Sequence, residues 1–222
     1  MTLLHLIPAL SKKRIVLASG SPRRREILTN LGLTFEVVVS TFDEDLDKSQ
    51  FGAGEYASET ALHKCIEVAT RLGADKPDLV IGSDTVVEID GQILEKPADR
   101  EDAMRMLRKL SGSEHRVHTG MALVCPGSTD PKLGTSPYIR QFHETTVVKF
   151  ADISEACLQA YVDSGEPMDK AGSYGIQGNA GSFVSTISGC FYNVVGFPLH
   201  RFCSEVGELV EGGHLQIEAG GK

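Results

Sequence analysis

The residues best suited to chemistry lie in segment 19–25, which reads SGSPRRR. An apolar run precedes this segment and an apolar helical stripe follows it, so a strand-to-helix turn is predicted here. The free N–H groups and partial positive charge of a helix N-terminus attract anions, and hydroxyl and guanidinium groups add to them. The arrangement favours a phosphate site. A solvated basic helix start is the alternative that the segment alone leaves open.

The charge distribution supports the phosphate interpretation. The 222-residue chain has a net charge of −8, yet residues 12–25 hold six basic residues and no acidic one. Such an acidic chain does not suit a nucleic-acid polymer or an anionic membrane, and 6% aromatic residues without tryptophan disfavour a base-stacking groove. We expect the six bases, joined by Lys64 and Lys96, to form one polyphosphate pocket. The GxxxxGK[ST] spacing is missing, which excludes a Walker A loop.

Two carboxylates are candidates for metal binding or proton transfer. Glu44 and Asp84 each follow a predicted strand, and strand ends are where α/β sheets place ligand groups. Two carboxylates beside a polyphosphate suit Mg²⁺, which completes its shell with water and substrate oxygens. Lys64 and Lys96 would add a cationic wall. Taken singly, each has a simpler alternative: a solvated acidic run, a turn at Asp84, or exposed lysines.

Other catalytic patterns are missing. Five cysteines without a CxxC pair argue against a disulfide framework or a zinc knuckle. Seven histidines without an HExxH pattern argue against catalytic zinc, and no GxSxG elbow marks an α/β-hydrolase. The N-terminal residues have neither the order of a signal peptide nor the length of a membrane span, so a cytoplasmic protein is expected.

Alternating helices and strands predict an α/β fold with a mixed sheet. Strands are predicted at 14–18, 35–39, 78–81, 86–89, 92–94, 116–124, 138–150 and 183–195, and helices at 22–32, 55–72, 99–110, 154–164 and 198–210. Ser21 and Pro22 are suited to begin the first helix. A loop is expected at 82–85, a tight turn at Asp90-Gly91, and a glycine-rich functional loop at 165–181.

Six motifs occur in the order typical of one known family. They are LASGSPRRREIL, GSDTVV, LEKP, MLRKLSG, GEPMDKAGSYGIQG and NVVGFPL, and they extend from Leu17 to Leu199. The chain therefore resembles the Maf family of nucleoside triphosphate pyrophosphatases. The resemblance implies an elongated mixed sheet flanked by helices, in two lobes with a central cleft, of the inosine triphosphate pyrophosphatase type. One Maf-like domain is expected at 1–210, with a flexible C-terminal tail or linker at 211–222.

The resemblance also implies a reaction and its residues. Family members hydrolyse a nucleoside triphosphate between the α and β phosphates with a divalent metal, Mg²⁺ or Mn²⁺. The triphosphate would be held by Ser19, Arg23, Arg24, Lys64 and Lys96, of which Arg24 and Lys96 would also be catalytic. Asp84 would be the general base, and Glu44 would join it in placing the metal.

Substrate choice is implied by three further matches. Subgroups that act on dTTP and UTP are similar to this chain in having Arg23, Thr85 and Gln177, although they commonly have Ala where this chain has Ser83. The Gln177 amide offers both a donor and an acceptor, which suits the O4 and N3 edge of thymine or uracil.

Two functions of other classes stay open beside this enzyme. One is a non-catalytic nucleotide-binding regulator or sensor that kept the pocket, and the other is an accessory domain with a structural role. The presence of Asp84, Lys96 and Glu44 favours the enzyme. A homodimer, and fusion to a methyltransferase domain in a longer protein, are further expectations from the resemblance.

Overall fold

One mixed sheet runs the length of the protein. The computed structural model describes residues 3–218. Its strands are β1 (Ile15–Leu17), β2 (Glu36–Val37), β3 (Leu79–Ile89), β4 (Gln92–Leu94), β5 (Glu114–Cys125), β6 (Tyr138–Phe150) and β7 (Val184–Ser188). Their spatial order is β2-β1-β3-β5-β6-β7, with β4 paired to β3 beside that path. β1 is parallel to β2 and β3, whereas the other pairs are antiparallel, which confirms the predicted mixed sheet.

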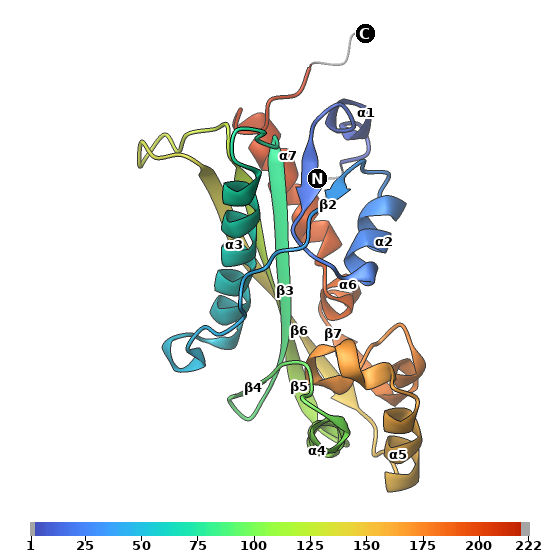
Figure 1. Ribbon diagram of the computed structural model, residues 1–222. Helices are drawn as coiled ribbons and strands as arrows, with labels where there is room; N and C mark the ends of the chain where they lie inside the picture. The colour runs from blue at the N-terminus through green and yellow to red at the C-terminus, as the bar shows by residue number, and fades with distance from the viewer. Residues whose placement is uncertain (1–2, 219–222) are drawn as a thin grey trace.

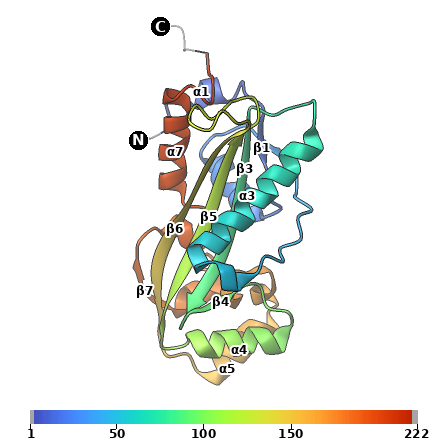
Figure 2. The ribbon, with the colours of Figure 1, turned by 90° about the vertical axis from the view of Figure 1, so that its left-hand side faces the viewer.

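Helices cover both faces of this sheet. They are α1 (Ile7–Leu10), α2 (Pro22–Asn30), α3 (Ala53–Leu72), α4 (Arg100–Leu110), α5 (Glu155–Asp163), α6 (Phe191–Val195) and α7 (Leu199–Glu211). Short 3₁₀ segments are η1 (Lys48–Gln50), η2 (Glu166–Asp169), η3 (Ala171–Ser173) and η4 (Asn179–Phe183). Figure 1 and Figure 2 show α3 on one face, α2, α6 and α7 on the other, and α4 with α5 at the far end.

Two hydrophobic cores lie at opposite ends of the sheet. The first joins α1, β1, α2 and α7 and includes Leu28, Phe197 and Phe202. The second joins α4 and α5 to the other ends of β3, β5 and β6 and includes Leu107 and Phe150. Because each buried apolar side chain of this size contributes roughly 1.5–3 kcal/mol, both ends are stabilised by their own packing. The predicted two lobes are therefore present, and the long strands run through both.

The predicted loop at 82–85 is wrong, because β3 continues through it from Leu79 to Ile89. Its glycine signals close helix packing instead of a turn: a Cβ on Gly82 would lie 2.4 Å from the Ala61 carbonyl oxygen of α3. Gly120 of β5, which is paired with Asp84 of β3, has the same role. A Cβ at Gly120 would lie 2.1 Å from the Ala57 carbonyl carbon. Asp84 thus lies within a strand under α3, and Glu44 lies several residues beyond β2, so neither directly follows a strand end.

The predicted strand at 183–195 is also wrong over its second half. β7 ends at Ser188, and α6 follows from Phe191 to Val195. Gly189, at φ 129°, turns the chain between them, and Gly196, at φ 111°, ends the helix. The apolar residues of this segment suited either element, and the two glycines with positive φ decide between them.

Most other elements agree with the sequence. Ser21 caps α2, Asp99 caps α4 and Ser154 caps α5, and the hairpin turns at Asp90-Gly91. The strand predicted at 35–39 is shorter, and the loop at 165–181 contains the segments η2 and η3 and the start of η4.

The tail predicted at 211–222 falls in part on residues 219–222, outside the described residues. Leu215 is buried in the first core. Within residues 3–218, the structure contains no helix with the length and apolar character needed to cross a membrane.

Candidate active site

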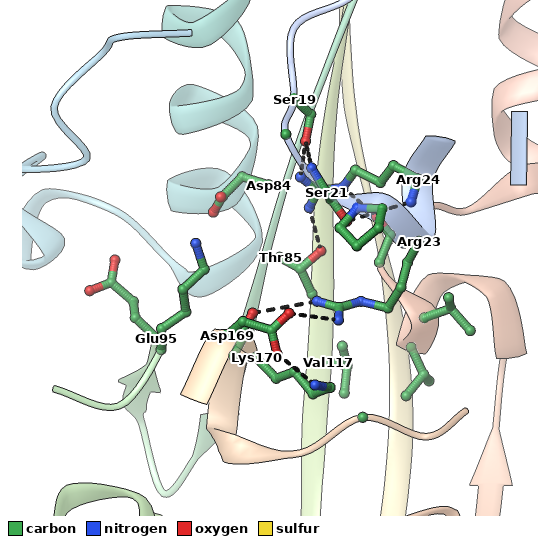
Figure 3. A pocket seen from close by; sticks show the side chains of 18 of the residues that line it. Ser19, Ser21, Arg23, Arg24, Asp84, Thr85, Glu95, Val117, Asp169 and Lys170 are labelled. Atoms are coloured by element: carbon green, nitrogen blue, oxygen red, sulfur yellow. Dashed lines mark hydrogen bonds and ion pairs between the residues drawn. The ribbon is translucent and has the colours of Figure 1, made fainter. Parts of the chain in front are cut away.

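A cavity of about 600 Å³ lies where one edge of β3 has no neighbouring strand. β1 pairs with Leu79–Ile81 and β4 pairs with Val87–Ile89, so residues 82–86 have no strand beside them on that edge. The β1–α2 loop, β3 and segment 169–177 line the cavity. Figure 3 shows Ser19 and Arg24 on one side and Asp169 with Lys170 on the other, so both lobes contribute.

The first turn of α2 brings Arg24 to the back of this cavity. Arg24 is buried, and each of its three guanidinium nitrogens donates one hydrogen bond. Nε donates to the Gly196 carbonyl at 2.9 Å. Nη1 donates to Ser19 Oγ at 2.9 Å, and Nη2 donates to Thr85 Oγ1 at 3.0 Å. The guanidinium is thereby fixed in one orientation before any ligand binds.

The charge of Arg24 is only partly balanced by its surroundings. Burial lowers the pKa of Arg24 from its ordinary value, and the nearby Asp84 carboxylate opposes that shift. A buried cation without a full ion pair is unfavourable unless an anion compensates it. The site is therefore suited to an anionic ligand.

Lys64 of α3 joins the two candidate carboxylates. Its Nζ lies 2.8 Å from Asp84 Oδ1 and 2.9 Å from Glu44 Oε1. Burial raises the pKa of the Asp84 carboxyl, although Lys64 and Arg24 act against it. Burial would also raise the pKa of Glu44, but Lys64 and Lys96 outweigh it and hold that pKa below its usual value. The two carboxylates consequently differ in their affinity for a proton.

Glu44 and Asp84 fit a divalent metal that arrives with its ligand. Among the residues described, no three His, Cys, Asp or Glu side chains converge as a ready metal cage. Glu44 and Asp84 nevertheless both reach Lys64 Nζ, so the position between them already favours a cation. Water and phosphate oxygens could complete an octahedral Mg²⁺ shell around two such carboxylates.

All nine side chains predicted from the sequence line this one cavity, namely Ser19, Arg23, Arg24, Glu44, Lys64, Asp84, Thr85, Lys96 and Gln177. Their surroundings differ. Arg23 Nη1 donates to Asp169 Oδ2 at 3.1 Å, across the cavity from α2. Lys96 and Gln177 are exposed, and neither side chain has a hydrogen-bond partner within residues 3–218.

The predicted convergence of six bases is wrong. Of the residues in segment 12–25, only Arg23 and Arg24 among the bases line the cavity. Lys12 pairs with Glu218, and Arg14 pairs with Glu36. The extended strand β1 carries these residues away from the α2 turn, because each residue advances the chain by about 3.3 Å.

Three charged residues of the cavity were missed as site residues. Asp169 accepts from Arg23 and from Lys170, whose Nζ lies 2.6 Å away. Glu95 Oε1 accepts from Tyr56 Oη at 2.6 Å, and its Oε2 lies 2.6 Å from Lys48 Nζ. Position beside Lys96 was a signal for Glu95, and the motif GEPMDKAGSYGIQG was one for Asp169 and Lys170.

The end of the cavity beside the second core has an apolar wall next to charged residues. Val87, Val117 and the ring of Tyr174 form the wall, and Asp169 and Lys170 lie on the same side. The Tyr174 hydroxyl lies 2.8 Å from Nε2 of the buried His115, so it is engaged away from the cavity. A flat, weakly polar group of ligand therefore fits this end.

The chain is similar to a known protein family and to several known proteins. A family model described as Maf-like protein matches residues 14–209. A human protein named probable bifunctional dTTP/UTP pyrophosphatase/methyltransferase protein is 54% identical over 94% of this chain, which spans 34% of the human protein's length. A dTTP/UTP pyrophosphatase of Clostridium perfringens is 44% identical over 85% of this chain and 93% of its own. One of Vibrio cholerae is 46% identical over 85% and 94%.

Among solved structures, the Ham1 protein of Staphylococcus aureus aligns with 90% of this chain and 99% of its own at 15% identity. The TM-score of this alignment is 0.43. The family model and the relatives at 44–54% identity cover most of the chain, and on that basis the chain belongs to the Maf-like protein family.

Proposed function

We propose that this chain hydrolyses nucleoside triphosphates, dTTP and UTP above all, to a nucleoside monophosphate and pyrophosphate. The observation that carries the proposal is a single cavity in which the buried Asp84 carboxylate lies with the buried cations Arg24 and Lys64. The names of the curated relatives support the same reaction and substrates. The site residues support it through their chemistry.

The triphosphate would bind at the α2 end of the cavity. Arg24 has five guanidinium N–H groups, and three of them already bind the protein, which leaves two for phosphate oxygens. Ser19, Arg23, Lys64 and Lys96 would add further donors and positive charge. Because Ser19, Arg24 and Lys64 are buried and held by other protein groups, they stabilise developing negative charge more strongly than water does.

Asp84 would act as the general base. Its carboxylate takes a proton from a water molecule, and the water oxygen forms a bond to the α-phosphorus. The bond from the α-phosphorus to the oxygen that bridges to the β-phosphorus breaks, and its electron pair leaves with pyrophosphate. The burial that raises the pKa of Asp84 makes it a better proton acceptor. Lys96 and Arg24 would neutralise charge on the phosphoryl group and the leaving pyrophosphate.

Glu44 and Asp84 would hold a divalent metal, Mg²⁺ or Mn²⁺, together with phosphate oxygens. When bound, the metal supplies positive charge at the phosphates. Lys64 keeps the two carboxylates together at a distance at which they would otherwise repel each other. It thereby preserves the site between turnovers.

The base of the nucleotide would occupy the apolar end. Tyr174 and Val117 offer a weakly polar surface there, and Gln177 lines the same cavity with its amide unpartnered among the described residues. An amide that both donates and accepts matches the O4 and N3 edge of uracil and thymine. These contacts support the preference for dTTP and UTP.

The wider setting is part of the same proposal. We propose that the enzyme is cytoplasmic, forms a homodimer and does not bind nucleic-acid polymers. The human relative, named as a bifunctional pyrophosphatase/methyltransferase, supports a methyltransferase domain as a fusion partner. The segment predicted as a tail or linker, 211–222, would then connect the two domains.

A product assay over a panel of triphosphates tests the function. Canonical and base-modified nucleotides are incubated with the chain and with Mg²⁺, Mn²⁺ or a chelator, and pyrophosphate and monophosphates are quantified. We expect the fastest turnover with dTTP and UTP, none with the chelator, and almost none with Asp84→Asn. Binding of dTTP with metal but no product over hours would overturn the proposal in favour of a nucleotide sensor.

A further inference from the structure

A line of three hydrogen bonds runs from Arg24 to the last turn of α6. Arg24 Nη2 lies 3.0 Å from Thr85 Oγ1, and Thr85 Oγ1 lies 3.0 Å from Thr119 Oγ1. Thr119 Oγ1 lies 2.9 Å from the Asn193 carbonyl oxygen. Thr85 and Thr119 face each other across β3 and β5, so the sheet register itself places their hydroxyls in contact.

The chemistry of the partners fixes the direction of every bond in this line. A carbonyl oxygen only accepts, so the single hydroxyl hydrogen of Thr119 is donated to Asn193. Thr119 then has no hydrogen left for Thr85, and Thr85 must donate to Thr119. A guanidinium only donates, so Thr85 accepts from Arg24 with one of its two lone pairs. The Thr85 hydroxyl therefore has no hydrogen to offer a ligand.

Ser19, on the other side of the guanidinium, has the opposite arrangement. Its Oγ accepts from Arg24 Nη1 at 2.9 Å and from the Ser21 backbone N–H at 3.3 Å. Both lone pairs are thus occupied, and its own hydrogen is free in the cavity that it lines. The two hydroxyls beside Arg24 consequently have different functions, one facing the ligand and one facing the protein.

We propose that Thr119 is a positioning residue of the site, which orients Thr85 as an acceptor and thereby fixes the plane of the Arg24 guanidinium toward bound phosphate. The proposal deepens the proposed function and rests on it for the identity of the ligand. It assigns Thr85 to holding Arg24 and Ser19 to donating to the phosphate.

The burial of the line explains why no other group can replace Thr119. Thr119 and Asn193 are both 0% exposed, so water does not reach the bond between them. The Asn193 carbonyl also accepts from the Gly196 N–H at 3.0 Å, and the Gly196 carbonyl accepts Arg24 Nε. The end of α6 therefore holds Arg24 by two routes, directly through Gly196 and indirectly through Thr119.

The test measures binding of inorganic tripolyphosphate by calorimetry, because this probe contacts the phosphate groups whether or not turnover occurs. We expect Thr119→Val to weaken binding about tenfold, since one oriented hydrogen bond is lost, and Thr119→Ser to restore it to within about twofold. In an Arg24→Lys background, which lacks Nη2, Thr119→Val should change binding by less than about twofold. An equal loss in both backgrounds, or wild-type affinity of Thr119→Val, overturns the proposal.

Two further variants separate positioning from folding. Thr146 is also 0% exposed and accepts from the Asn193 side chain at 2.9 Å, but it does not lie in the line to Arg24. Thr146→Val should therefore leave tripolyphosphate affinity within about twofold, whatever it does to the melting temperature. If Thr119→Val fails to fold, Thr85→Val takes its place, and wild-type affinity of that variant overturns the proposal.

The same measurements distinguish this inference from the proposed function. Loss of tripolyphosphate binding in Thr119→Val with no hydrolysis of dTTP by the wild type would remove the function and keep the positioning role. Hydrolysis of dTTP by the wild type, with kcat and KM unchanged in Thr119→Val, would keep the function and remove the positioning role. Ser19→Ala should mainly raise KM, because it removes a donor to bound phosphate and leaves two of the three bonds that hold Arg24.

Discussion

The two ends of the cavity are built in different ways. At the α2 end, Arg24, Lys64 and Asp84 are buried, and each is held by other protein groups. At the end beside the second core, apolar side chains form the wall, and Gln177 is exposed without a partner among the described residues. The first end is organised before a ligand binds, whereas the second is free to adapt to it. We infer that reaction chemistry depends on the first end and nucleotide choice on the second.

The largest effect should come from Asp84 at the organised end. Asp84→Asn removes the proton acceptor, and we expect kcat for dTTP to fall by about 10³-fold. In the absence of metal, tripolyphosphate should bind at least as tightly as before, because a negative charge has been removed. Steady-state kinetics and calorimetry measure the two quantities.

The matched control for Asp84 is Glu95→Gln. Glu95 lines the same cavity, but Tyr56 and Lys48 hold its carboxylate at the rim. The Glu95→Gln substitution should change kcat by less than about fivefold, because loss of an ion pair near the surface has a small effect. Similar losses in both variants would contradict a special role for Asp84.

Arg24 should give the next largest effect. Arg24→Lys keeps the charge but loses the planar set of donors, and kcat/KM for dTTP should fall by about 10²-fold. Arg25→Lys serves as its control, because Arg25 is exposed and does not line the cavity. The value of kcat/KM for dTTP should be unchanged in this variant. A retained rate in Arg24→Lys would show that charge alone suffices at this end.

Next to the adaptable end, the buried His115 should make the free energy of unfolding depend on pH. His115 is 2% exposed beneath Tyr174, and burial lowers its pKa to about 4 from an ordinary 6.5. The unfolded chain gains this proton near pH 6.5 and the folded chain only near pH 4, so stability falls as the pH decreases through that window. The expected contribution is about 3 kcal/mol in the free energy of unfolding.

Denaturant titration between pH 7 and 4 measures this contribution. His115→Phe, which suits the neighbouring rings of Phe150 and Tyr174, should remove that part of the pH dependence. An identical slope in wild type and variant would mean that folding does not lower the pKa of His115, which would contradict this prediction.

The smallest effect concerns Gln177. Gln177→Ala should lower kcat/KM for dTTP by about tenfold, because it removes base contacts, and leave tripolyphosphate affinity unchanged. Gln177→Glu, which keeps an acceptor and loses the donors, distinguishes reading of O4 from reading of N3–H. A parallel loss of tripolyphosphate binding would place Gln177 at the phosphate end and contradict the comparison.

The sequence predicted which side chains line the cavity better than it predicted their arrangement. Ser21 and Pro22 identified the start of α2, and the nine side chains predicted for the site all line the cavity. Seven of them lie in the ordered motifs, whereas Glu44 and Lys64 lie outside those motifs. The continuation of β3 through residues 82–85 could not be predicted, because Gly-Ser-Asp-Thr is a sequence typical of turns. The glycine at position 82 is explained only by the close approach of α3. Lys12 and Arg14 form ion pairs with residues distant in the sequence. The local density of positive charge therefore overestimated the number of basic residues in the pocket.

The hydrogen bonds that link Arg24 to Thr119 and Asn193 also could not be predicted from the local sequence. Thr119 and Asn193 are ordinary strand and helix residues in the sequence, and their relation to Arg24 depends on the register of β3 with β5 and on the position of α6. Lys64 was placed beside an apolar stripe, but nothing local showed that it would join Glu44 to Asp84.

Hydrolysis of dTTP in ¹⁸O-labelled water, with product analysis by mass spectrometry, tests the central claim most directly. Attack of water on the α-phosphorus predicts unlabelled pyrophosphate and dTMP with one ¹⁸O atom on its phosphate. Orthophosphate with dTDP, or label in the pyrophosphate, would contradict cleavage by attack at the α-phosphorus in this cavity.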